Sequence, residues 1–396
     1  MVRCRVMDAA APARVLTREF LVVVAASTAV FASFGILVVA LPLYIRDELG
    51  RSDLGVGIAI GAASIGAIIA GPLAGRLADR RGRRVFLFGG VAAMLMGYLV
   101  LAFEPPFSVV VPLRVVAGAG ESAFVVAAYT MATDLTPSGR HGEAMSLITT
   151  GSYVGLAIGP IAGDLAIDKL GFAVAWLLAA GAVGLAGAVA LAVRETRPIH
   201  DEAPPAGWLP PRSALLPGLV LLLALLGFGG FNAFVVLHAR EVGVERPGLV
   251  FLVFAGVVIL VRLFGRTLPD RLGARAAAST ACAAVASGLV IVAAWQTPAG
   301  LFIGTAVFAV GQAFAYPAIA LLAMSRATIA ERSAALGAVI AFVDVALVSG
   351  AFLLGIAAEL AGYGAVFALG AVSAAGGLVL LSRVSVKPAH ADPAPS

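Results

Sequence analysis

Long apolar stretches alternate with short polar segments along the whole chain. Most stretches reach about 20 residues, the length that an α-helix needs to cross the hydrocarbon core of a membrane. The stretches are continuous and lack the two-residue alternation of membrane β-strands, so helices are expected. We predict an all-α membrane protein with twelve transmembrane helices, over residues 19–45, 54–75, 85–103, 108–133, 144–166, 173–193, 215–238, 248–267, 276–295, 299–324, 334–358 and 364–383.

A polar, proline-rich segment separates the first six predicted helices from the last six. It has prolines at positions 204, 205, 210 and 211, which favour an extended spacer over a folded domain. The chain is therefore expected to comprise an N-terminal six-helix half at 1–193, a cytoplasmic linker at 194–214 and a C-terminal six-helix half at 215–396.

Composition agrees with a membrane protein and excludes several other classes. The chain is 61% hydrophobic and 12% charged, whereas soluble domains carry about 25% charge. A water-soluble enzyme, a disordered chain and a nucleic-acid-binding domain are excluded on this ground. The net charge of +5 comes from basic residues in the short segments between apolar stretches, which is typical of membrane topology.

These basic residues also predict the orientation of the chain. With the N-terminus in the cytoplasm, the cytoplasmic segments hold 20 of the 27 lysines and arginines, and the outer loops hold five. Cytoplasmic loops of membrane proteins carry such an excess. We expect a multi-pass protein of a bacterial inner membrane with both termini in the cytoplasm.

A short loop sequence occurs twice, at a spacing close to half the chain. GPLAGRLADRRGRR covers 71–84 after the second span, and GRTLPDRLGAR covers 265–275 after the eighth. The alignment places Asp79 over Asp270. A repeat at half the chain length is typical of a duplicated transporter with two pseudo-symmetric halves.

The first copy resembles the loop motif of the major facilitator superfamily, and the resemblance covers the whole twelve-span plan. The matching residues are Gly71, Leu73, Ala74, Asp79, Arg80, Gly82, Arg83 and Arg84. The resemblance implies that Asp79 meets the positive start of the eleventh span, and that Asp270, beside Arg271, meets the start of the fifth. Such contacts are expected to latch the two halves together on the cytoplasmic side.

The fourth predicted span carries two charges on one face. Glu121 follows Arg114 by seven residues, which is two helical turns, and lies near the middle of the membrane. Charges at this depth usually face a water-filled cavity or a partner. The run from Arg114 to Gly118 and Gly120 resembles the fourth-span motif of proton-coupled members of the superfamily. We expect Glu121 to carry a proton and Arg114 to control its release; a static ion pair is the alternative.

The fifth predicted span has glycine at every fourth position. One smooth face carries Gly151, Gly155, Gly159 and Gly163, and Pro160 bends the helix. The run resembles the fifth-span motif associated with antiporters of the superfamily, with Asp164 in place of a second final glycine. This resemblance implies export by exchange, whereas generic small-residue packing is the alternative.

The second half adds another acid at mid-membrane depth. Asp344 lies about ten residues into the eleventh span, and we expect it to couple protons or cations. An ion pair, for example with Arg114, is the alternative. Predicted substrate contacts are Phe34, Phe124, Tyr129, Phe228, Asn232, Gln312 and Tyr316.

Together these features predict a secondary active transporter that works by alternating access around a site near mid-membrane. Two acids and one arginine within an apolar, aromatic lining favour proton-coupled export of small amphipathic or cationic molecules. A sugar or metabolite permease and a non-transporting receptor or scaffold are the alternatives. The sequence offers no metal cluster, nucleophile with a base or phosphate loop. Accordingly, neither an enzyme nor a cofactor is expected, and the transporter is expected to act as a monomer.

Overall fold

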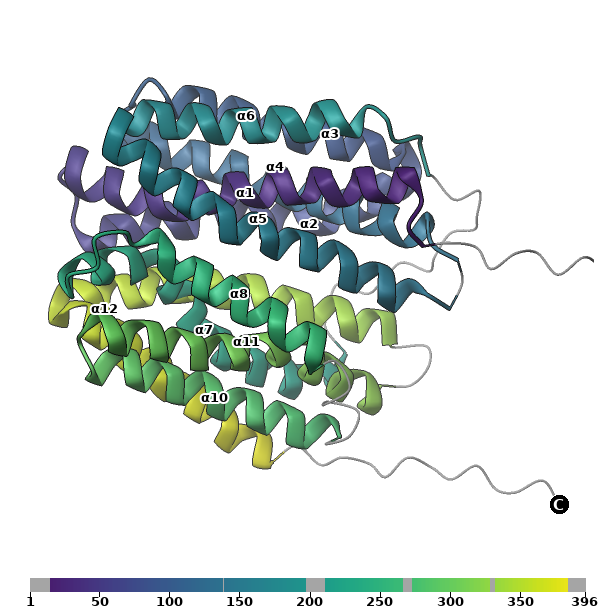
Figure 1. Cartoon of the computed structure of the whole chain (residues 1–396). Coiled ribbons are helices and arrows are strands. Elements are labelled where there is room, and N and C mark those ends of the chain that lie inside the picture. Colours follow the sequence, from purple (N-terminus) through teal and green to yellow (C-terminus); the bar gives the residue numbers. More distant parts are fainter. Residues whose placement is uncertain (1–14, 138, 197–210, 266–272, 328–331, 384–396) are drawn as a thin grey trace, which may run out of the picture.

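The fold is all-helical and is described by a computed structural model (Figure 1). The structure describes residues 15–137, 139–196, 211–265, 273–327 and 332–383, except for the side chains at positions 76, 79, 212, 332–334 and 336. The helix labels below are those of Figure 1.

The first six helices form the N-terminal half. Helix α1 continues into a π-helical turn, η1, at Tyr44–Glu48. The helices of this half are α1 (Arg18–Leu43), α2 (Asp53–Arg81), α3 (Arg83–Leu101), α4 (Phe107–Asp134), α5 (His141–Leu170) and α6 (Phe172–Ala190). These bounds agree with the first six predicted spans to within a few residues, except that α2 extends six residues further.

The C-terminal half contains α7 (Arg212–Glu241), α8 (Gly248–Phe264), α10 (Ala274–Ala294), α11 (Pro298–Arg326) and α12 (Arg332–Ser382). Helix α12 consists of two helices that follow each other directly, since its backbone leaves the helical region at Gly362 with a φ of 75°. Glycine adopts this φ readily because it has no Cβ. The two arms of α12, 332–361 and 363–382, correspond to the two predicted spans. Counting both arms, the described part of the chain has twelve apolar helical segments, which is consistent with the twelve predicted spans.

Close helix packing depends on glycine. In the glycine face of α5, a Cβ on Gly155 would collide with the backbone of Thr28 and Ala32 in α1, and a Cβ on Gly159 would collide with Ala32 and Gly35. The backbones of α1 and α5 therefore approach as closely as in other small-residue contacts between membrane helices.

The two halves meet mainly through two helix pairs. Helix α2 packs on the first arm of α12, and α5 packs on α8. In the first pair, Gly57 lies against the backbone of Ala351 and Gly355. The halves form two helical bundles that lie side by side (Figure 1). Segment η1 and the start of α2 lie at one end of these bundles, on the left of Figure 1. We call this the η1 end; α1 begins at the opposite end.

Candidate functional site: a charged cavity between the halves

A cavity of about 420 Å³ lies between the two halves. Helices α1, α2 and α4 line it on the N-terminal side, and α7 and the first arm of α12 line it on the other. Four polar side chains predicted from the sequence reach this one space, namely Arg114, Glu121, Asn232 and Asp344. The structure thus brings together both predicted acids, the predicted arginine and one predicted substrate contact.

Helix α4 positions Glu121 and Arg114 at different depths on one face. Glu121 is near the middle of this 28-residue helix, and Arg114 lies about 10 Å from its start at 1.5 Å per residue. Gly118 lies between them and allows close approach, because a Cβ there would collide with the backbone of Ala63 in α2. The arginine and the acid are thereby held on a face that also seals α4 against α2.

The charges in the cavity influence one another without direct pairing. Glu121 interacts electrostatically with both Arg114 and Asp344. No ion pair of 4 Å or less joins Arg114 to either acid, although the structure describes all three side chains. Arg114 is 3% exposed, and its Nε has no hydrogen-bond partner among the described residues. This arrangement differs from the static ion pair considered as an alternative.

The remaining lining is mostly apolar, with aromatic rings on one side. Phe31 and Phe34 of α1 meet edge to face, with 6.5 Å between ring centroids. Ser64 of α2 and Ser122 of α4 also line the cavity. The sequence analysis missed both serines, because a serine in an alanine-rich span carries no signal of the direction it faces.

Several predicted substrate contacts lie elsewhere. Phe124 is fully buried where α4 meets α3, and Tyr129 shares a hydrogen bond of 3.0 Å with Ser152 of α5. Phe228 stacks on Phe254 within the C-terminal half, at 5.5 Å between centroids. Gln312 is buried in α11, and its Nε2 has no partner among the described residues.

Tyr316, also on α11, contacts a separate core cluster within the C-terminal half. It is likewise not among the lining residues of the cavity. Of the seven predicted substrate contacts, the cavity therefore contains Phe34 and Asn232.

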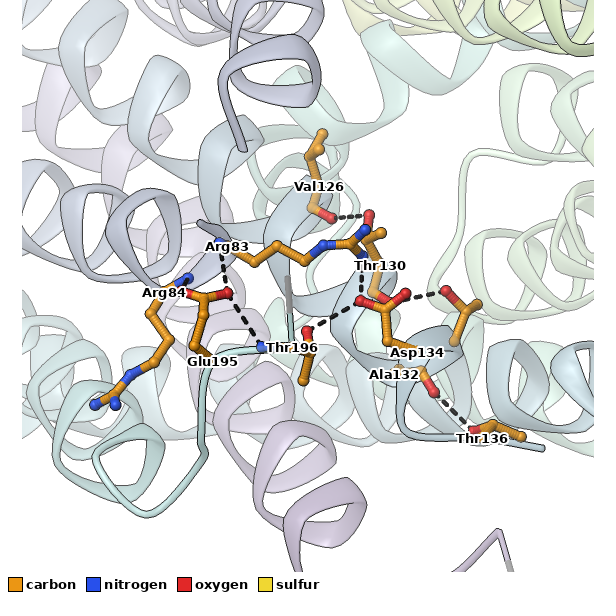
Figure 2. A network of polar contacts seen from close by, with 10 residues as sticks. Arg83, Arg84, Val126, Thr130, Ala132, Asp134, Thr136, Glu195 and Thr196 are labelled. Atoms are coloured by element: carbon orange, nitrogen blue, oxygen red, sulfur yellow. Dashed lines mark hydrogen bonds and ion pairs between the residues drawn. The ribbon is translucent and has the colours of Figure 1, made fainter. Parts of the chain in front are cut away.

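The loop motif forms a polar network inside the N-terminal half (Figure 2). Arg83 forms an ion pair with Asp134 at the end of α4. The Glu195 carboxylate accepts hydrogen bonds from the backbone N–H groups of Arg83 and Arg84, at 2.8 and 3.1 Å. Since Gly82 has a φ of 97°, glycine suits the turn that starts α3. These contacts join α3, α4 and the segment after α6.

The predicted latch between the halves falls largely outside the described residues. The side chain of Asp79 lies outside the described part of the chain, and so do Asp270 and Arg271 as a whole. Arg80 is exposed, and Gly71 lies beside the hydroxyl of Ser122.

At the η1 end, one carboxylate of each half accepts a hydrogen bond from the first turn of a helix in the other half. Asp164 of α5 accepts a hydrogen bond from the backbone N–H of Gly248, the first residue of α8. Glu359 of α12 accepts one from Leu54, the second residue of α2, at 3.4 Å. These contacts occupy equivalent places in the two halves, and a helix start favours negative charge.

Two side-chain pairs add to this closure. Arg240 of α7 binds Asp47 at 2.6 Å, and the Tyr363 hydroxyl donates to Asp53 at 2.9 Å. The η1 end is therefore closed by polar contacts between the halves. The sequence analysis noted Asp164 only as a departure from a motif, and it assigned no partner to it.

Comparisons with known proteins agree with this architecture. The sequence profile of the Major Facilitator Superfamily matches residues 23–245, more than half of the chain. An uncharacterized MFS-type transporter of Salmonella typhimurium is 28% identical over 356 residues, with 87% of this chain and 90% of that protein covered. One of Burkholderia pseudomallei is 29% identical over 374 residues, with 92% and 91% covered.

Solved transporter structures share the fold at low sequence identity. The nucleoside transporter NupG aligns with a TM-score of 0.79 and 14% identity, over 92% of this chain and 99% of that one. A peptide transporter, POT, aligns with a TM-score of 0.77 and 16% identity, over 94% and 96%. From its apolar helices and the matched profile, the chain belongs to the Major Facilitator Superfamily and is a multi-pass membrane transporter.

Proposed function

We propose that this transporter exports small amphipathic or cationic molecules in exchange for protons. The observation that carries the proposal is the cavity between the halves, where Glu121 and Asp344 lie on opposite walls beside the rings of Phe31 and Phe34. Carboxylates attract a cation, and aromatic faces stabilise it further. An apolar lining of this size suits the hydrocarbon part of such a molecule.

Exchange follows from competition for the same carboxylates. When Glu121 and Asp344 are ionised, the cavity holds negative charge that a cationic substrate neutralises. When protons bind, this attraction is lost and the substrate leaves. Arg114 can balance the charge of Glu121 after its proton leaves, because opposite charges attract. Protons and substrate therefore occupy the cavity alternately, as antiport requires.

Alternating access requires the η1 end to open and close. We assign this end to the outer side of a bacterial inner membrane, with both termini in the cytoplasm, in line with the excess of basic residues on the other side. Opening it breaks the contacts of Asp164 and Glu359. On the cytoplasmic side, Asp79 and Asp270, with Arg80 and Arg271 beside them, close the halves in the other state. Asp79→Asn is expected to lower transport while membrane insertion stays normal.

The cavity favours this substrate class over sugars. Its described lining contains one amide, Asn232, and two serines, which is a sparse set of partners for a molecule with many hydroxyl groups. The intact loop motif and the charge of Glu121 inside a span also favour transport over a receptor or scaffold, because scaffolding needs neither. The glycine face of α5, with Gly151, Gly163 and Pro160, supports the antiporter reading by its resemblance to the fifth-span motif.

The test is transport by the purified monomeric protein in liposomes. A proton gradient, acidic on the side of the outer face, is expected to drive accumulation of ethidium or tetraphenylphosphonium on that side. An uncoupler dissipates the gradient and should stop the movement. Transport of these cations that is indifferent to the gradient, or its absence across a broad panel of amphipathic compounds, contradicts the proposal.

A further inference from the structure

A second cavity lies on the surface of the C-terminal half, between α10 and the second arm of α12. Its volume is about 720 Å³. The walls are mainly alanine and glycine, including Ala286 and Ala293 on α10 and Ala365 and Ala368 on α12. Small side chains leave this space unfilled between two helices that otherwise pack together. We call it the α10–α12 groove.

The groove faces the membrane and is about as long as one leaflet is deep. Val290 and Val372 line it and are 52% and 67% exposed, so this surface meets lipid. Its lining on the second arm of α12 runs from Tyr363 to Ala375, about 18 Å at 1.5 Å per residue. Half of a hydrocarbon core is about 15 Å thick. The groove therefore starts at the membrane interface and covers the depth of one leaflet.

The mouth of the groove, at the η1 end, carries an uncompensated acid. Glu241 lines the groove at the end of α7, and its side chain is 60% exposed. Its carboxylate lies 3.5 Å from Nδ1 of the buried His238. Among the described residues, no lysine or arginine comes within 4 Å of it. Gln296 adds an exposed amide at the same level.

We propose that the α10–α12 groove binds one acyl chain of a phospholipid whose headgroup carries a primary ammonium group. The chain occupies the alanine-lined groove, and the ammonium group donates hydrogen bonds to Glu241. A charge-assisted hydrogen bond of this kind needs N–H donors, which a quaternary choline lacks. An anionic headgroup is repelled by the same carboxylate. This binding is independent of the proposed transport reaction.

The test is native mass spectrometry of the delipidated full-length transporter with phosphatidylethanolamine, phosphatidylcholine or phosphatidylglycerol of identical acyl chains. One phosphatidylethanolamine per transporter is expected to bind about two- to fivefold more tightly than the other two lipids, as an ion pair with an exposed carboxylate gives. Glu241→Gln should remove this preference and leave similar weak binding of all three. Ala368→Leu fills the groove and should weaken binding of all three.

The matched control is Ala92→Leu, which adds the same side chain to an exposed alanine on α3, away from the groove. It should bind lipid like the unchanged protein, and thermal unfolding in detergent establishes that all variants are folded. Equal binding of the three lipids by the unchanged protein contradicts the proposal. So does a preference for phosphatidylethanolamine that survives both Glu241→Gln and Ala368→Leu.

Discussion

The two walls of the central cavity surround their acidic residues with different side chains. On the N-terminal wall, Glu121 shares its helix with the buried Arg114 and faces aromatic rings on α1. On the C-terminal wall, Asp344 lies among Ile340, Val343 and Leu347, and no lysine or arginine of the described part of α7 or α12 lines the cavity with it. The two acids of the cavity thus have different electrostatic surroundings.

This difference leads us to assign separate roles to the two acids. An arginine on the same wall can balance the charge of a carboxylate after its proton leaves, so Glu121 is suited to exchange protons in each cycle. A buried charged carboxylate that has no cation nearby is unfavourable, and a positively charged ligand supplies the missing partner. Asp344 is therefore the better partner for the positive group of the substrate.

The largest effect is expected from the N-terminal wall. Glu121→Gln keeps the shape and hydrogen-bonding capacity but removes the proton site, so proton-driven flux should fall to the level of protein-free liposomes. Ser122→Ala is the matched control, since it changes the next residue of the same cavity and should retain most of the flux. Proton-driven flux that persists in Glu121→Gln removes this acid from the mechanism.

The C-terminal wall should respond through substrate affinity. Asp344→Asn should weaken binding of a cationic substrate by about 10- to 100-fold, the value of a hydrogen bond to a charged group. A neutral compound of the same shape should bind both proteins alike. Isothermal titration with the two compounds measures the difference, and an equal loss for both compounds would indicate damage to the cavity rather than loss of charge.

The η1 end offers a second comparison, between its two helix-start contacts. Asp164→Ala removes a partly buried acceptor, at a cost of about 1–2 kcal/mol to the closed state, which shifts the open population about tenfold. Glu359→Ala should shift it less, because this carboxylate is exposed and its bond is longer. Spin labels placed across the η1 end report the populations. An equal or reversed order contradicts the ranking.

The smallest effect is expected from the aromatic side of the cavity. Phe34→Leu removes one ring that faces a cation and should raise its dissociation constant about two- to fivefold, as a cation–π contact of 0.5–1 kcal/mol gives. Leu347→Met, on the opposite wall, changes an aliphatic side chain and should leave affinity unchanged. If both variants lower the affinity for the cation equally, the aromatic wall contributes no more to cation binding than the aliphatic wall.

The helices themselves could be predicted because each depends on local composition. Windows of about 20 residues identify the spans, and single glycines such as Gly82 mark where one helix gives way to the next. The break between the last two spans lies at Gly362, inside the interval that separates the two predicted spans. That this glycine adopts a positive φ could not be predicted, because the chain is rich in glycine.

The charged residues of the cavity were predicted better than its apolar ones. A charge in a membrane span has few stable places, so Arg114, Glu121 and Asp344 could be assigned to a cavity. A phenylalanine is equally stable between helices. Phe124 lies on the side of α4 that faces α3, together with Gly120 one turn away. Glu121 is only three residues before Phe124 but lines the cavity.

The contacts between the two halves could not be predicted from the sequence. Asp164 and Gly248 are 84 residues apart, and Glu359 and Leu54 are 305 apart. Each pair forms only because the two bundles meet, and neither partner carries a local sign of the other.

The central claim is that substrate and protons compete for the cavity acids, and proton release on substrate binding tests it most directly. Ethidium or tetraphenylphosphonium is added to the purified protein in weakly buffered detergent solution, and the pH is recorded. Release of protons is predicted for the unchanged protein and for Ser122→Ala, and it should vanish in Glu121→Gln combined with Asp344→Asn. Binding of these cations without proton release, or release that persists in the double variant, contradicts the account.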